Sequence, residues 1–330
     1  MWVYIVIYHP TGEHSMINKD LRIAVICGGA SSEREVSLRS GKAVYGALCS
    51  AGYKNTVLFD LTKESMGELL STPIDVAFLA LHGKGGEDGC IQGMLELAGI
   101  PYTGSGVESS ACCMDKIRTK ELLVAANIPT ASFIKLSKDQ CQDRAAAAKL
   151  IAECIGLPAV LKSPCEGSSI GVYIAKNICE IEKYMDGVFS YGDELLAEAF
   201  LDGTEITLPI LGNRELNILP PVEITSENEF YDFDAKYTQG MCHHIIPARI
   251  SDGDLNKVRE IGERAYKQLG CRGISRIDFI IDKEKGPMVI EINTLPGMTE
   301  MSLFPDSARY AGISFSELCE RIIAYALEKK

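Results

Sequence analysis

Residues 275–299 read SRIDFIIDKEKGPMVIEINTLPGMT, which is the most informative segment of the chain. It predicts a β-hairpin, with strands over 271–281 and 287–293 joined by a turn at 283–286. Residues two apart on a strand share a face, so the polar face is expected to carry Arg276, Asp278 and Ile280 from the first strand and Val289, Glu291 and Asn293 from the second. The other face is apolar and carries Ile277, Phe279, Ile290 and Ile292.

The polar face of this hairpin brings two carboxylates and an amide together. Asp278, Glu291 and Asn293 are expected to converge their oxygens, and such a donor set, without His or Cys, suits Mg²⁺ or Mn²⁺ bound to phosphate. The alternative is a solvated polar face, which is common in antiparallel hairpins. We favour the metal site, because the second strand leads directly into a loop in which the Gly297 amide can face a ligand.

Toward the N-terminus, alternating strand and helix patterns predict a parallel sheet. Two buried strands are expected, the second over 74–81, and Ser32 with Glu35 predicts a capping box that starts a helix. In βαβ folds the loops after the strands hold the active site, which makes Glu33 and His82 candidates. The alternatives are an acid favoured by the helix dipole for Glu33 and a structural role for His82.

Two further α/β regions follow along the chain. In the first, strands are expected over 132–136, 159–162, 171–175 and 195–200, with helices from Asp115 to Ala126 and over 144–155 and 177–186. In the second we expect a strand over 204–211, a polar loop over 226–245, a helix over 254–269 and a last helix with a capping box at Ser314 and Glu317. His243 and His244 are expected to be loop residues and not metal ligands. The predicted divisions are an extension (1–20) and domains over 21–114, 115–203 and 204–330.

Two loops between these elements have the composition of anion-binding segments. Residues 162–171 (KSPCEGSSIG) join two strands and can offer backbone N–H groups and hydroxyls to phosphate; an ordinary flexible turn is the alternative. The sequence contains neither a Walker loop nor a complete G-x-G-x-x-G motif. Residues 230–237 (FYDFDAKY) mix aromatic side chains with Lys236, as a lid over an anion does, and a packed surface loop is the alternative.

The composition excludes several classes of protein. Of 330 residues, 46% are apolar and 24% are charged, and 33 Lys and Arg against 45 Asp and Glu give a net charge of −12. This balance argues against a nucleic-acid or anionic-membrane partner, and no apolar run approaches the roughly 20 residues of a membrane span. The 12 cysteines form no C-x-x-C pair, so reduced thiols in a cytoplasmic protein are expected. Residues 1–18, which include an apolar run at 2–8, are expected to be either an extra strand or the result of a mistaken start codon.

In their order along the chain, these segments resemble the D-alanine–D-alanine ligase family of ATP-grasp enzymes. The resemblance covers residues 22–326 and rests on GGASSEREVSL (28–38), LHGKGGEDG (81–89), GSG (104–106), MDK (114–116), EGSS (166–169), AKY (235–237), RID (276–278) and EINTLPGMT (291–299). Each motif alone is weak, whereas the ordered set is specific. The resemblance implies an α/β protein with the ATP-grasp fold, in which three α/β domains hold ATP between the central and C-terminal sheets.

The resemblance also implies a reaction. The carboxylate of one D-alanine attacks the γ-phosphate of ATP to give an acyl phosphate and ADP. The amine of a second D-alanine then displaces phosphate, which gives D-alanyl-D-alanine for peptidoglycan synthesis. Further implications are two Mg²⁺ or Mn²⁺ ions, a cytoplasmic location and a homodimer. No protein nucleophile is needed, because a substrate carboxylate attacks.

Matched position by position, the family motifs imply roles for individual residues. Catalytic roles fall to Glu33, Ser168, Tyr237, Arg276 and Gly297. Substrate binding falls to Glu33, His82, Arg276, Ser302 and Leu303. ATP binding falls to Lys116, Lys162, Ser168, Glu198, Ala199, Phe200, Glu205 and Lys236. The metal ions are expected on Asp278, Glu291 and Asn293.

The sequence departs from the family pattern at two places. Ala199 stands where relatives often have Lys, and Lys162-Ser-Pro replaces the commoner Lys-Pro-Ser. Tyr237 favours an amine acceptor, since relatives that use D-lactate carry a different residue there. A D-alanine–D-serine ligase is the alternative within the enzyme class, and a nucleotide-binding relative without catalysis is the alternative outside it.

Overall fold

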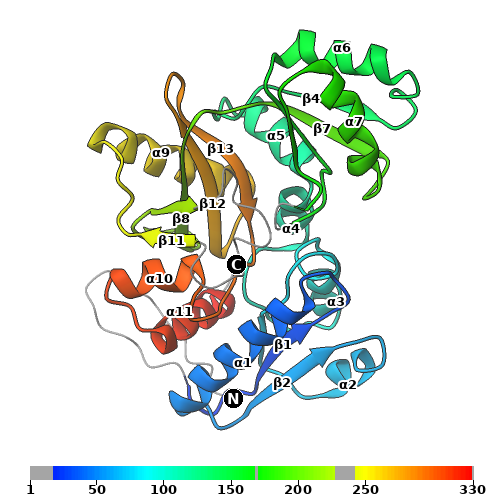
Figure 1. The fold of residues 1–330 in the computed structure, drawn as a ribbon. Coiled ribbons are helices and arrows are strands. Elements are labelled where there is room, and N and C mark those ends of the chain that lie inside the picture. The colour runs from blue at the N-terminus through cyan, green and yellow to red at the C-terminus, as the bar shows by residue number, and fades with distance from the viewer. Residues whose placement is uncertain (1–17, 168–169, 227–241, 329–330) are drawn as a thin grey trace.

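The computed structural model describes residues 18–167, 170–226 and 242–328, and it contains three β-sheets with helices packed on them (Figure 1). The sheets follow one another along the chain, with three strands in the N-terminal sheet, four in the central sheet and six in the C-terminal sheet. In Figure 1 the central sheet lies at the upper right, the C-terminal sheet at centre left and the N-terminal sheet below. The chain is therefore a mixed α/β protein, as the sequence predicts.

The N-terminal sheet is parallel, which confirms the βαβ prediction. Its strands lie in the order β2-β1-β3. The elements are β1 (Ile23–Gly28), α1 (Arg34–Ser50), β2 (Thr56–Leu61), α2 (Met66–Ser71), β3 (Val76–Leu79) and α3 (Cys90–Leu97). Because β1 and β3 are parallel neighbours, the loops that follow them leave the same edge of the sheet.

The start of α1 differs from the prediction. Ser32 and Glu35 do not form a capping box: the helix begins one residue after Glu33, which makes no side-chain capping bond. The chain turns at Ser31 instead, whose hydroxyl donates to the His82 carbonyl (2.7 Å) and accepts from the Glu33 N–H (3.2 Å). This tertiary contact delays the helix and leaves Glu33 in the loop that precedes it.

Two helices, α4 (Val107–Met114) and α5 (Lys116–Ala125), connect the N-terminal and central sheets. The sequence predicts only the second of them, because α4 is short and its apolar residues have no clear helical spacing. Asp115 separates the helices and caps α5, accepting from the N–H groups of Ile117 (2.9 Å) and Arg118 (3.2 Å). The cap fixes the first turn of α5, which carries Lys116.

The central sheet is antiparallel, with strand order β4-β7-β5-β6 and two helices over one face. Its elements are β4 (Phe133–Ser137), α6 (Arg144–Ile155), β5 (Ala159–Lys162), β6 (Tyr173–Ala175), α7 (Ile178–Phe189) and β7 (Glu194–Ala199). Leu161 and Ala197 face the helices in a closed core, while their neighbours Lys162 and Glu198 face the other side. All predicted elements of this region form, although β6 starts two residues later and α7 ends three residues later than expected.

The C-terminal sheet has the order β11-β10-β8-β12-β13, with β9 paired to β8 and α9 over one face. Its elements are β8 (Gly203–Gly212), β9 (Leu216–Ile218), β10 (Val222–Ser226), β11 (Cys242–Ile245), α9 (Asp252–Gln268), β12 (Gly273–Asp282) and β13 (Gly286–Asn293). The predicted loop over 226–245 is wrong at its end, because β11 pairs antiparallel with β10, with Thr225 opposite His243. His243 and His244 thus lie in an edge strand, whose formation depends on pairing more than on its own composition.

A β-bulge in the hairpin of β12 and β13 changes the predicted alternation. Asp278 pairs with Glu291, but Phe279 pairs with Val289, which leaves Ile290 as an extra residue. Val289 therefore packs with Phe279 in the core that includes α9. Ile290 lies outside that core and lines a pocket. The predicted positions of Val289 and Ile290 are thus exchanged, whereas Asp278 and Glu291 stay together.

The last two helices return to the N-terminal sheet. They are α10 (Leu303–Tyr310) and α11 (Phe315–Leu327). One core cluster joins Val25 of that sheet with Leu318 of α11. Ser314 caps α11 by accepting from the Glu317 N–H (3.2 Å), so the helix begins where the pattern of Ser314 and Glu317 predicts. The N-terminal sheet therefore shares its core with the end of the chain.

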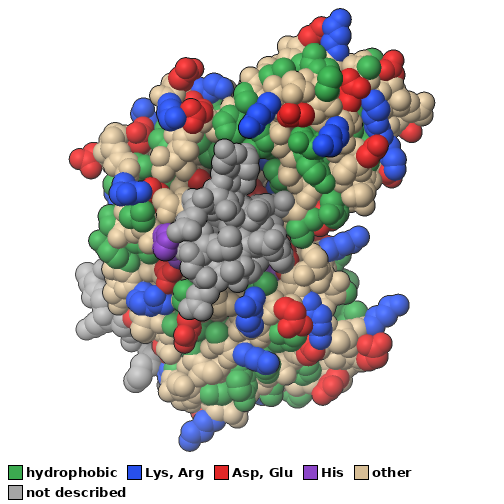
Figure 2. Space-filling view, viewed as in Figure 1, with side chains coloured by type: hydrophobic (Ala, Val, Ile, Leu, Met, Phe, Trp, Pro, Cys, Tyr) green, Lys and Arg blue, Asp and Glu red, His purple; other side chains and the backbone are tan. Residues whose placement is uncertain are grey.

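The described surface carries charges of both signs. On the face shown in Figure 2, Lys and Arg side chains are interspersed with Asp and Glu. The net charge of −12 is thus not gathered into one acidic patch on the described part of this face. Among the described helices, none combines the length and apolar character that crossing a bilayer requires.

Candidate active site

A cavity of about 1190 Å³ lies between the central and C-terminal sheets and reaches the loops of the N-terminal sheet. Strands β5 and β7 contribute to one wall, and β12 and β13 contribute to the other. All predicted site residues that the structure describes line it: Glu33, His82, Lys116, Lys162, Glu198, Ala199, Phe200, Glu205, Arg276, Asp278, Glu291, Asn293, Gly297, Ser302 and Leu303. Ser168, Lys236 and Tyr237 lie outside the described residues.

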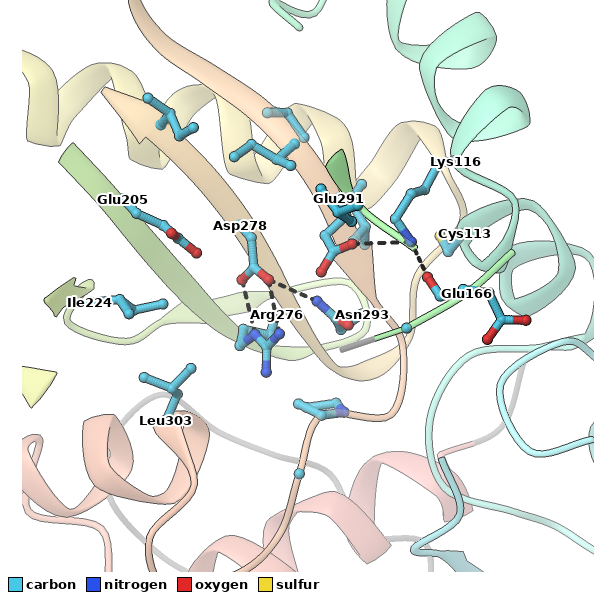
Figure 3. Close-up of a pocket in the computed structure, with 18 of the residues that line it drawn as sticks. Cys113, Lys116, Glu166, Glu205, Ile224, Arg276, Asp278, Glu291, Asn293 and Leu303 are labelled. Carbon is cyan, nitrogen blue, oxygen red and sulfur yellow. Dashed lines mark hydrogen bonds and ion pairs between the residues drawn. The ribbon is translucent and has the colours of Figure 1, made fainter. Parts of the chain in front are cut away.

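The predicted metal ligands lie together on the hairpin (Figure 3). Asp278 and Glu291 are cross-strand partners, and the Asn293 Nδ2 donates to Asp278 Oδ2 at 3.1 Å. Arg276 forms a bidentate ion pair with Asp278, with Nε 2.9 Å from Oδ1 and Nη2 2.8 Å from Oδ2. Lys116 Nζ lies 3.3 Å from Glu291 Oε2. Each carboxylate therefore has a cation beside it, which compensates its charge in this largely buried place.

The oxygens of this cluster fit a hard divalent cation. Among the described residues, no group of three His, Cys, Asp or Glu side chains could hold a metal, so a site here needs the amide of Asn293 as well as the two carboxylates. Magnesium is commonly bound in this way, by one or two carboxylates with substrate phosphates completing the shell. The donor set is thus suited to an ion that arrives with a nucleotide.

Lys116 and Lys162 bring positive charge to the cavity from α5 and β5. Lys116 Nζ donates to the carbonyl of Glu166 (2.8 Å) in the loop after β5. Burial alone lowers the pKa of Lys116, but Glu291 and Glu198 outweigh burial and leave the pKa raised, so the ammonium stays charged. Lys162 pairs with Glu198. Two ammonium groups are therefore available to an anionic ligand.

Sequence reasoning missed Lys120, which lines the same cavity and is 1% exposed. Its Nζ lies 2.6 Å from Glu198 Oε1. A signal was present in the sequence, because Lys116 and Lys120 are four residues apart and share a face of α5.

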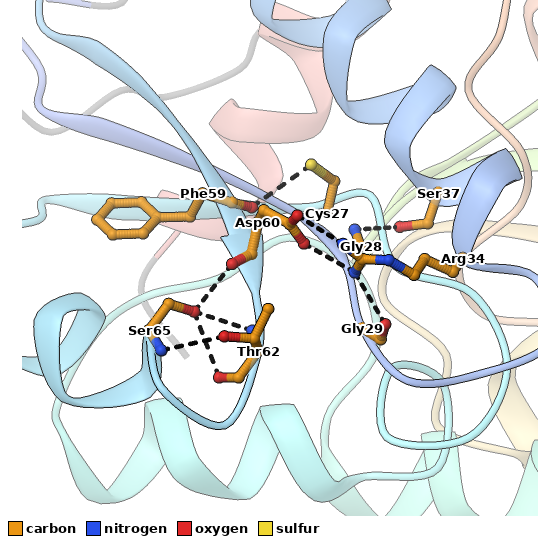
Figure 4. Close-up of polar contacts among 9 residues, drawn as sticks. All are labelled: Cys27, Gly28, Gly29, Arg34, Ser37, Phe59, Asp60, Thr62 and Ser65. Carbon is orange, nitrogen blue, oxygen red and sulfur yellow. Dashed lines mark hydrogen bonds and ion pairs between the residues drawn. The ribbon is translucent and has the colours of Figure 1, made fainter.

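The loop that carries Glu33 is held by an ion pair (Figure 4). Arg34 forms a bidentate ion pair with Asp60 at the end of β2, with Nη1 2.8 Å from Oδ1 and Nη2 2.6 Å from Oδ2. Its Nη1 also donates to the Gly29 carbonyl (3.0 Å). Gly28 has φ +84°, and a Cβ there would lie 2.0 Å from Asp60 Oδ1. A glycine is therefore required at this position, and the loop is fixed where it leaves β1.

Glu33 and His82 lie at the N-terminal end of the cavity. The Glu33 carboxylate lies against two other loops, since a Cβ on Gly83 or on Gly167 would come within 3.0 Å of Oε2. His82 is 7% exposed, and its Nε2 lies 3.2 Å from the Ser40 hydroxyl. Burial outweighs the opposing effect of Glu33 and lowers the pKa of His82, so the imidazole is neutral at neutral pH.

Glu87 is a second residue that sequence reasoning missed, because a single acid in a glycine-rich loop has no informative spacing. It lines the cavity and accepts from the Gly83 N–H at 2.6 Å. Burial and the charge of Glu33 raise the pKa of Glu87 to about 8, although the bond from Gly83 opposes this. The Glu87 carboxyl is therefore mostly protonated at neutral pH.

The raised pKa of Glu87 predicts how stability changes with pH. Its protonated form favours the folded state fully below the unfolded value of about 4.3, and this contribution is lost as the pH rises through about 8. Glu87→Gln keeps a neutral acceptor for Gly83 and should therefore unfold at a higher temperature than the wild type at pH 9. At pH 9 we expect the free energy of unfolding of Glu87→Gln to exceed that of the wild type by about 1–2 kcal/mol. The difference is small because Glu87 is partly exposed, so that solvent screens its charge.

Thermal unfolding from pH 6 to pH 9 measures this difference. Glu68→Gln is the control, because Glu68 is exposed on α2. If Glu87→Gln and the wild type lost stability in parallel as the pH rose, Glu87 would have an ordinary pKa.

The loop after β13 forms the far end of the cavity. The Ser302 hydroxyl accepts from the Thr299 N–H at 3.1 Å and lies 2.7 Å from Thr299 Oγ1. A Cβ at Gly297 would lie 2.9 Å from Ser302 Oγ, so the glycine allows this close approach. Leu303 packs against Ile224 of β10. The residues predicted to bind the second substrate are thus held between the loop and the C-terminal sheet.

Comparisons with known proteins identify the family of this chain. A family model described as D-ala D-ala ligase C-terminus matches residues 122–324, and one described as D-ala D-ala ligase N-terminus matches residues 62–105. The curated D-alanine–D-alanine ligase of Desulforamulus reducens is 48% identical over 312 residues, which are 94% of this chain and 99% of that protein. The chain belongs to the D-alanine–D-alanine ligase family. The resemblance inferred from the motifs is therefore confirmed.

Solved structures of ligases agree with this family. The Bacillus anthracis D-alanine–D-alanine ligase complexed with ATP has a TM-score of 0.79 and 35% identity, and the match covers 93% of this chain and 97% of that one. The VanG D-Ala:D-Ser ligase from Enterococcus faecalis has the same TM-score with 29% identity, covering 93% and 100%. These similarities confirm the ATP-grasp fold for this ligase-family chain.

Proposed function

We propose that this chain joins two D-alanine molecules to D-alanyl-D-alanine, using ATP and passing through an acyl phosphate, as a step in peptidoglycan synthesis. The observation that carries the proposal is the single cavity in which two carboxylates, Arg276 and two lysines converge. The names of the curated relatives support the reaction, and the ATP complex of the Bacillus anthracis ligase supports the nucleotide.

The first step brings together two anions, the carboxylate of the first D-alanine and the triphosphate of ATP. Lys116 and Lys162 offset their repulsion at the phosphates. The substrate oxygen attacks the γ-phosphorus, the bond to the β-phosphate oxygen breaks, and ADP leaves. The cavity therefore needs to supply position and positive charge, and it needs no protein nucleophile.

The N-terminal loops hold the first D-alanine in this proposal. Glu33 binds its ammonium group, and its neighbours in this role are Ser168 and Tyr237, which lie outside the described residues. His82 lies near the substrate carboxylate. Because its imidazole is neutral, it can donate a hydrogen bond without attracting the carboxylate away from the phosphate.

The second step forms the peptide bond. The amine of the second D-alanine attacks the acyl carbonyl, and phosphate leaves. Arg276 and the Gly297 N–H are proposed to stabilise the tetrahedral oxyanion, and such donors are typically worth about 3–4 kcal/mol each. Ser302, with Leu303 beside it, is proposed to hold the carboxylate of the second substrate; both residues line the far end of the cavity.

Adenine is proposed to bind at the end of β7. Glu198 faces the cavity there, followed by Ala199 and Phe200. The N–H groups of the last two already donate to the carbonyls of Ser132 (2.9 Å) and Pro158 (3.2 Å), so their contact with adenine has to use a carbonyl. The remaining nucleotide contacts are proposed for Glu205, Ser168 and Lys236.

Asp278, Glu291 and Asn293 are the proposed ligands of two Mg²⁺ or Mn²⁺ ions. When bound, these ions would neutralise phosphate charge and polarise the transferred phosphoryl group. Arg276 is paired with Asp278 and Lys116 with Glu291, two of these proposed ligands. We infer that both cations turn toward the reactants when the ligand site is filled.

A D-alanine–D-serine ligase is the second candidate, favoured by the similarity to VanG. The curated relatives named for D-alanine as both substrates are more similar in sequence, at 48% and 47% identity. Tyr237, which favours an amine acceptor, lies outside the described residues. We therefore rank D-alanine first as the acceptor.

We also propose a cytoplasmic location and a homodimer, with neither nucleic acid nor membrane as partner. The cysteines whose side chains the structure describes are free thiols, which supports a reducing compartment. Analytical ultracentrifugation of the purified chain tests the dimer directly, and a single species at the mass of one chain would contradict it.

The decisive experiment is a product assay with the purified chain, ATP and Mg²⁺. D-Alanine, D-serine and D-lactate are supplied as acceptors alone and in competition, and the products are weighed by mass spectrometry. We expect ADP release that depends on D-alanine, with D-alanyl-D-alanine as the main product. A folded protein that released no ADP with any acceptor would leave only the non-catalytic nucleotide-binding relative.

The ion pair in the Glu33 loop predicts an effect on the first substrate. Arg34→Ala should raise the KM for D-alanine about tenfold with little change in the KM for ATP, because a small displacement of a positioning group is costly. Arg22→Ala is the control, since Arg22 also forks onto a carboxylate, Asp75, at the edge of the same sheet (Nε–Oδ2 3.0 Å). Equal effects of both substitutions would indicate a general loss of stability.

A further inference from the structure

Lys120 carries a buried charge that the mechanism above does not use. Its side chain is 1% exposed. Its Nζ lies near three acceptors: Glu198 Oε1 (2.6 Å), Thr130 Oγ1 (2.5 Å) and the Ala131 carbonyl (3.2 Å). Three acceptors match the three N–H donors of an ammonium group and fix Lys120 in place. Burial and the charge of Lys162 lower the pKa of Lys120, and the Glu198 carboxylate opposes them by favouring the charged form.

Lys162 shares the same carboxylate but is held differently. Glu198 lies between a lysine from α5 and a lysine from β5, with Oε1 on Lys120 and Oε2 on Lys162. Among the residues that the structure describes, the Lys162 ammonium pairs with Glu198 alone. Lys120 is thus anchored by two uncharged groups in addition to Glu198, whereas Lys162 can leave by breaking one contact.

The charge balance gives the two lysines different roles. One carboxylate with two ammonium groups carries a net charge of +1. When Lys162 moves onto a phosphate, Glu198 keeps Lys120 as its counter-ion, and no carboxylate is left alone in a buried place. Burial raises the pKa of Glu198, but Lys162 and Lys120 together outweigh burial and lower it.

The geometry points to Lys120 as a positioning residue for ATP: it holds Glu198 in place as a charged group and so allows Lys162 to leave Glu198 for a phosphate oxygen. Lys120 acts through these two residues. Thr130, which accepts from Lys120, also connects Lys120 to the C-terminal sheet, because its hydroxyl donates to the Val289 carbonyl of β13 (2.8 Å). The inference rests on the proposed function, because it requires ATP in this cavity.

A double-mutant cycle on ATP affinity tests this role. The full-length wild type, Lys120→Met, Glu198→Gln and the double variant are titrated calorimetrically with ATP in the presence of Mg²⁺. Lys120→Met should weaken ATP binding at least about tenfold, because an unshared Glu198 retains Lys162. The double variant should bind ATP more tightly than Lys120→Met, because a neutral side chain at position 198 releases Lys162.

Controls separate positioning from stability. Lys135→Met removes a lysine that is also paired with a glutamate (Glu121 Oε1, 2.5 Å) but is exposed, and it should leave ATP affinity unchanged. Lys120→Arg keeps the charge and should recover part of the affinity. Lys120→Gln replaces Lys120→Met in the cycle if the latter does not fold. The KM for D-alanine should stay within about twofold of the wild-type value, since the first substrate binds elsewhere in the cavity.

Two results would overturn the inference. One is a folded Lys120→Met variant with wild-type affinity for ATP. The other is a double variant that binds ATP no better than Lys120→Met, which is what a purely structural lysine would give. Failure of the proposed function would differ from both, because the wild type itself would then not bind ATP or not release ADP with D-alanine.

Discussion

Arg276→Ala is expected to reduce kcat for dipeptide formation about 10³-fold, because it removes the guanidinium that we propose stabilises the oxyanion. ATP binding should be retained, since Lys116 and Lys162, the lysines proposed to bind the phosphates, lie on α5 and β5. The substitution also takes a cation away from Asp278, whose two oxygens accept hydrogen bonds from Arg276. Binding of ATP with Mg²⁺ should therefore be unchanged or tighter, while turnover is lost. Steady-state kinetics and calorimetric titration measure the two effects separately.

Two further variants sharpen this result. Arg276→Lys keeps a positive charge without the bidentate fork and should recover a small part of kcat. Arg118→Ala removes an exposed arginine that pairs with Glu121 (2.7 Å), and it should leave kcat unchanged. Loss of ATP binding together with turnover in Arg276→Ala would show that Arg276 serves the nucleotide and that the proposed division of roles is wrong.

Asp278→Asn is expected to shift the metal requirement of the enzyme. The loss of an outer-shell partner costs roughly 10–100-fold in metal affinity, and the loss of a ligand charge should cost more. Activity should therefore fall at low Mg²⁺ and recover in part at high Mg²⁺ or Mn²⁺. Manganese binding in the presence of ADP, followed by electron paramagnetic resonance, gives a readout that does not depend on turnover.

The control for this prediction is Asp202→Asn, which neutralises an exposed carboxylate paired with Lys283 (2.8 Å). It should leave the metal dependence unchanged. If Asp278→Asn bound Mn²⁺ as tightly as the wild type, the carboxylate would serve only to hold Arg276, and the metal ligands would have to be sought elsewhere in the cavity.

Elements with strong local signals could be predicted from the sequence almost to the residue. Helix α6 is one example: Asp143 caps it by accepting from the Ala146 N–H (3.0 Å), and Gly156 with φ +81° ends it. Strand β5 ends, as predicted, at Lys162. Such boundaries depend on residues within one turn of each other, and these residues can be read directly from the sequence.

Features that depend on distant partners could not be predicted. The bulge at Ile290 results from pairing with β12, and β11 exists because β10 lies beside it. The capping box at Ser32 fails because Ser31 is bound to the carbonyl of His82, far along the chain. In each case a tertiary contact overrides a correct local rule.

The candidate site likewise contains residues that the sequence reveals and residues that only the folded structure reveals. The resemblance to a family supplied the roles of residues such as Glu33 and Arg276, whose motifs are distinctive. It did not supply Lys120 or Glu87, because their importance depends on burial and on neighbouring charges that only the folded chain reveals. Their roles follow from electrostatics in the cavity and not from motif spacing.

The shared core of the first sheet and the last helix has a consequence for synthesis on the ribosome. The apolar side chains of β1 that pack on α11 cannot be covered until the final residues have emerged. Throughout translation the nascent N-terminal third therefore presents an unshielded apolar surface, which is a hazard for aggregation. Premature termination before Phe315 would release a product with an incomplete first sheet, not merely a shorter enzyme.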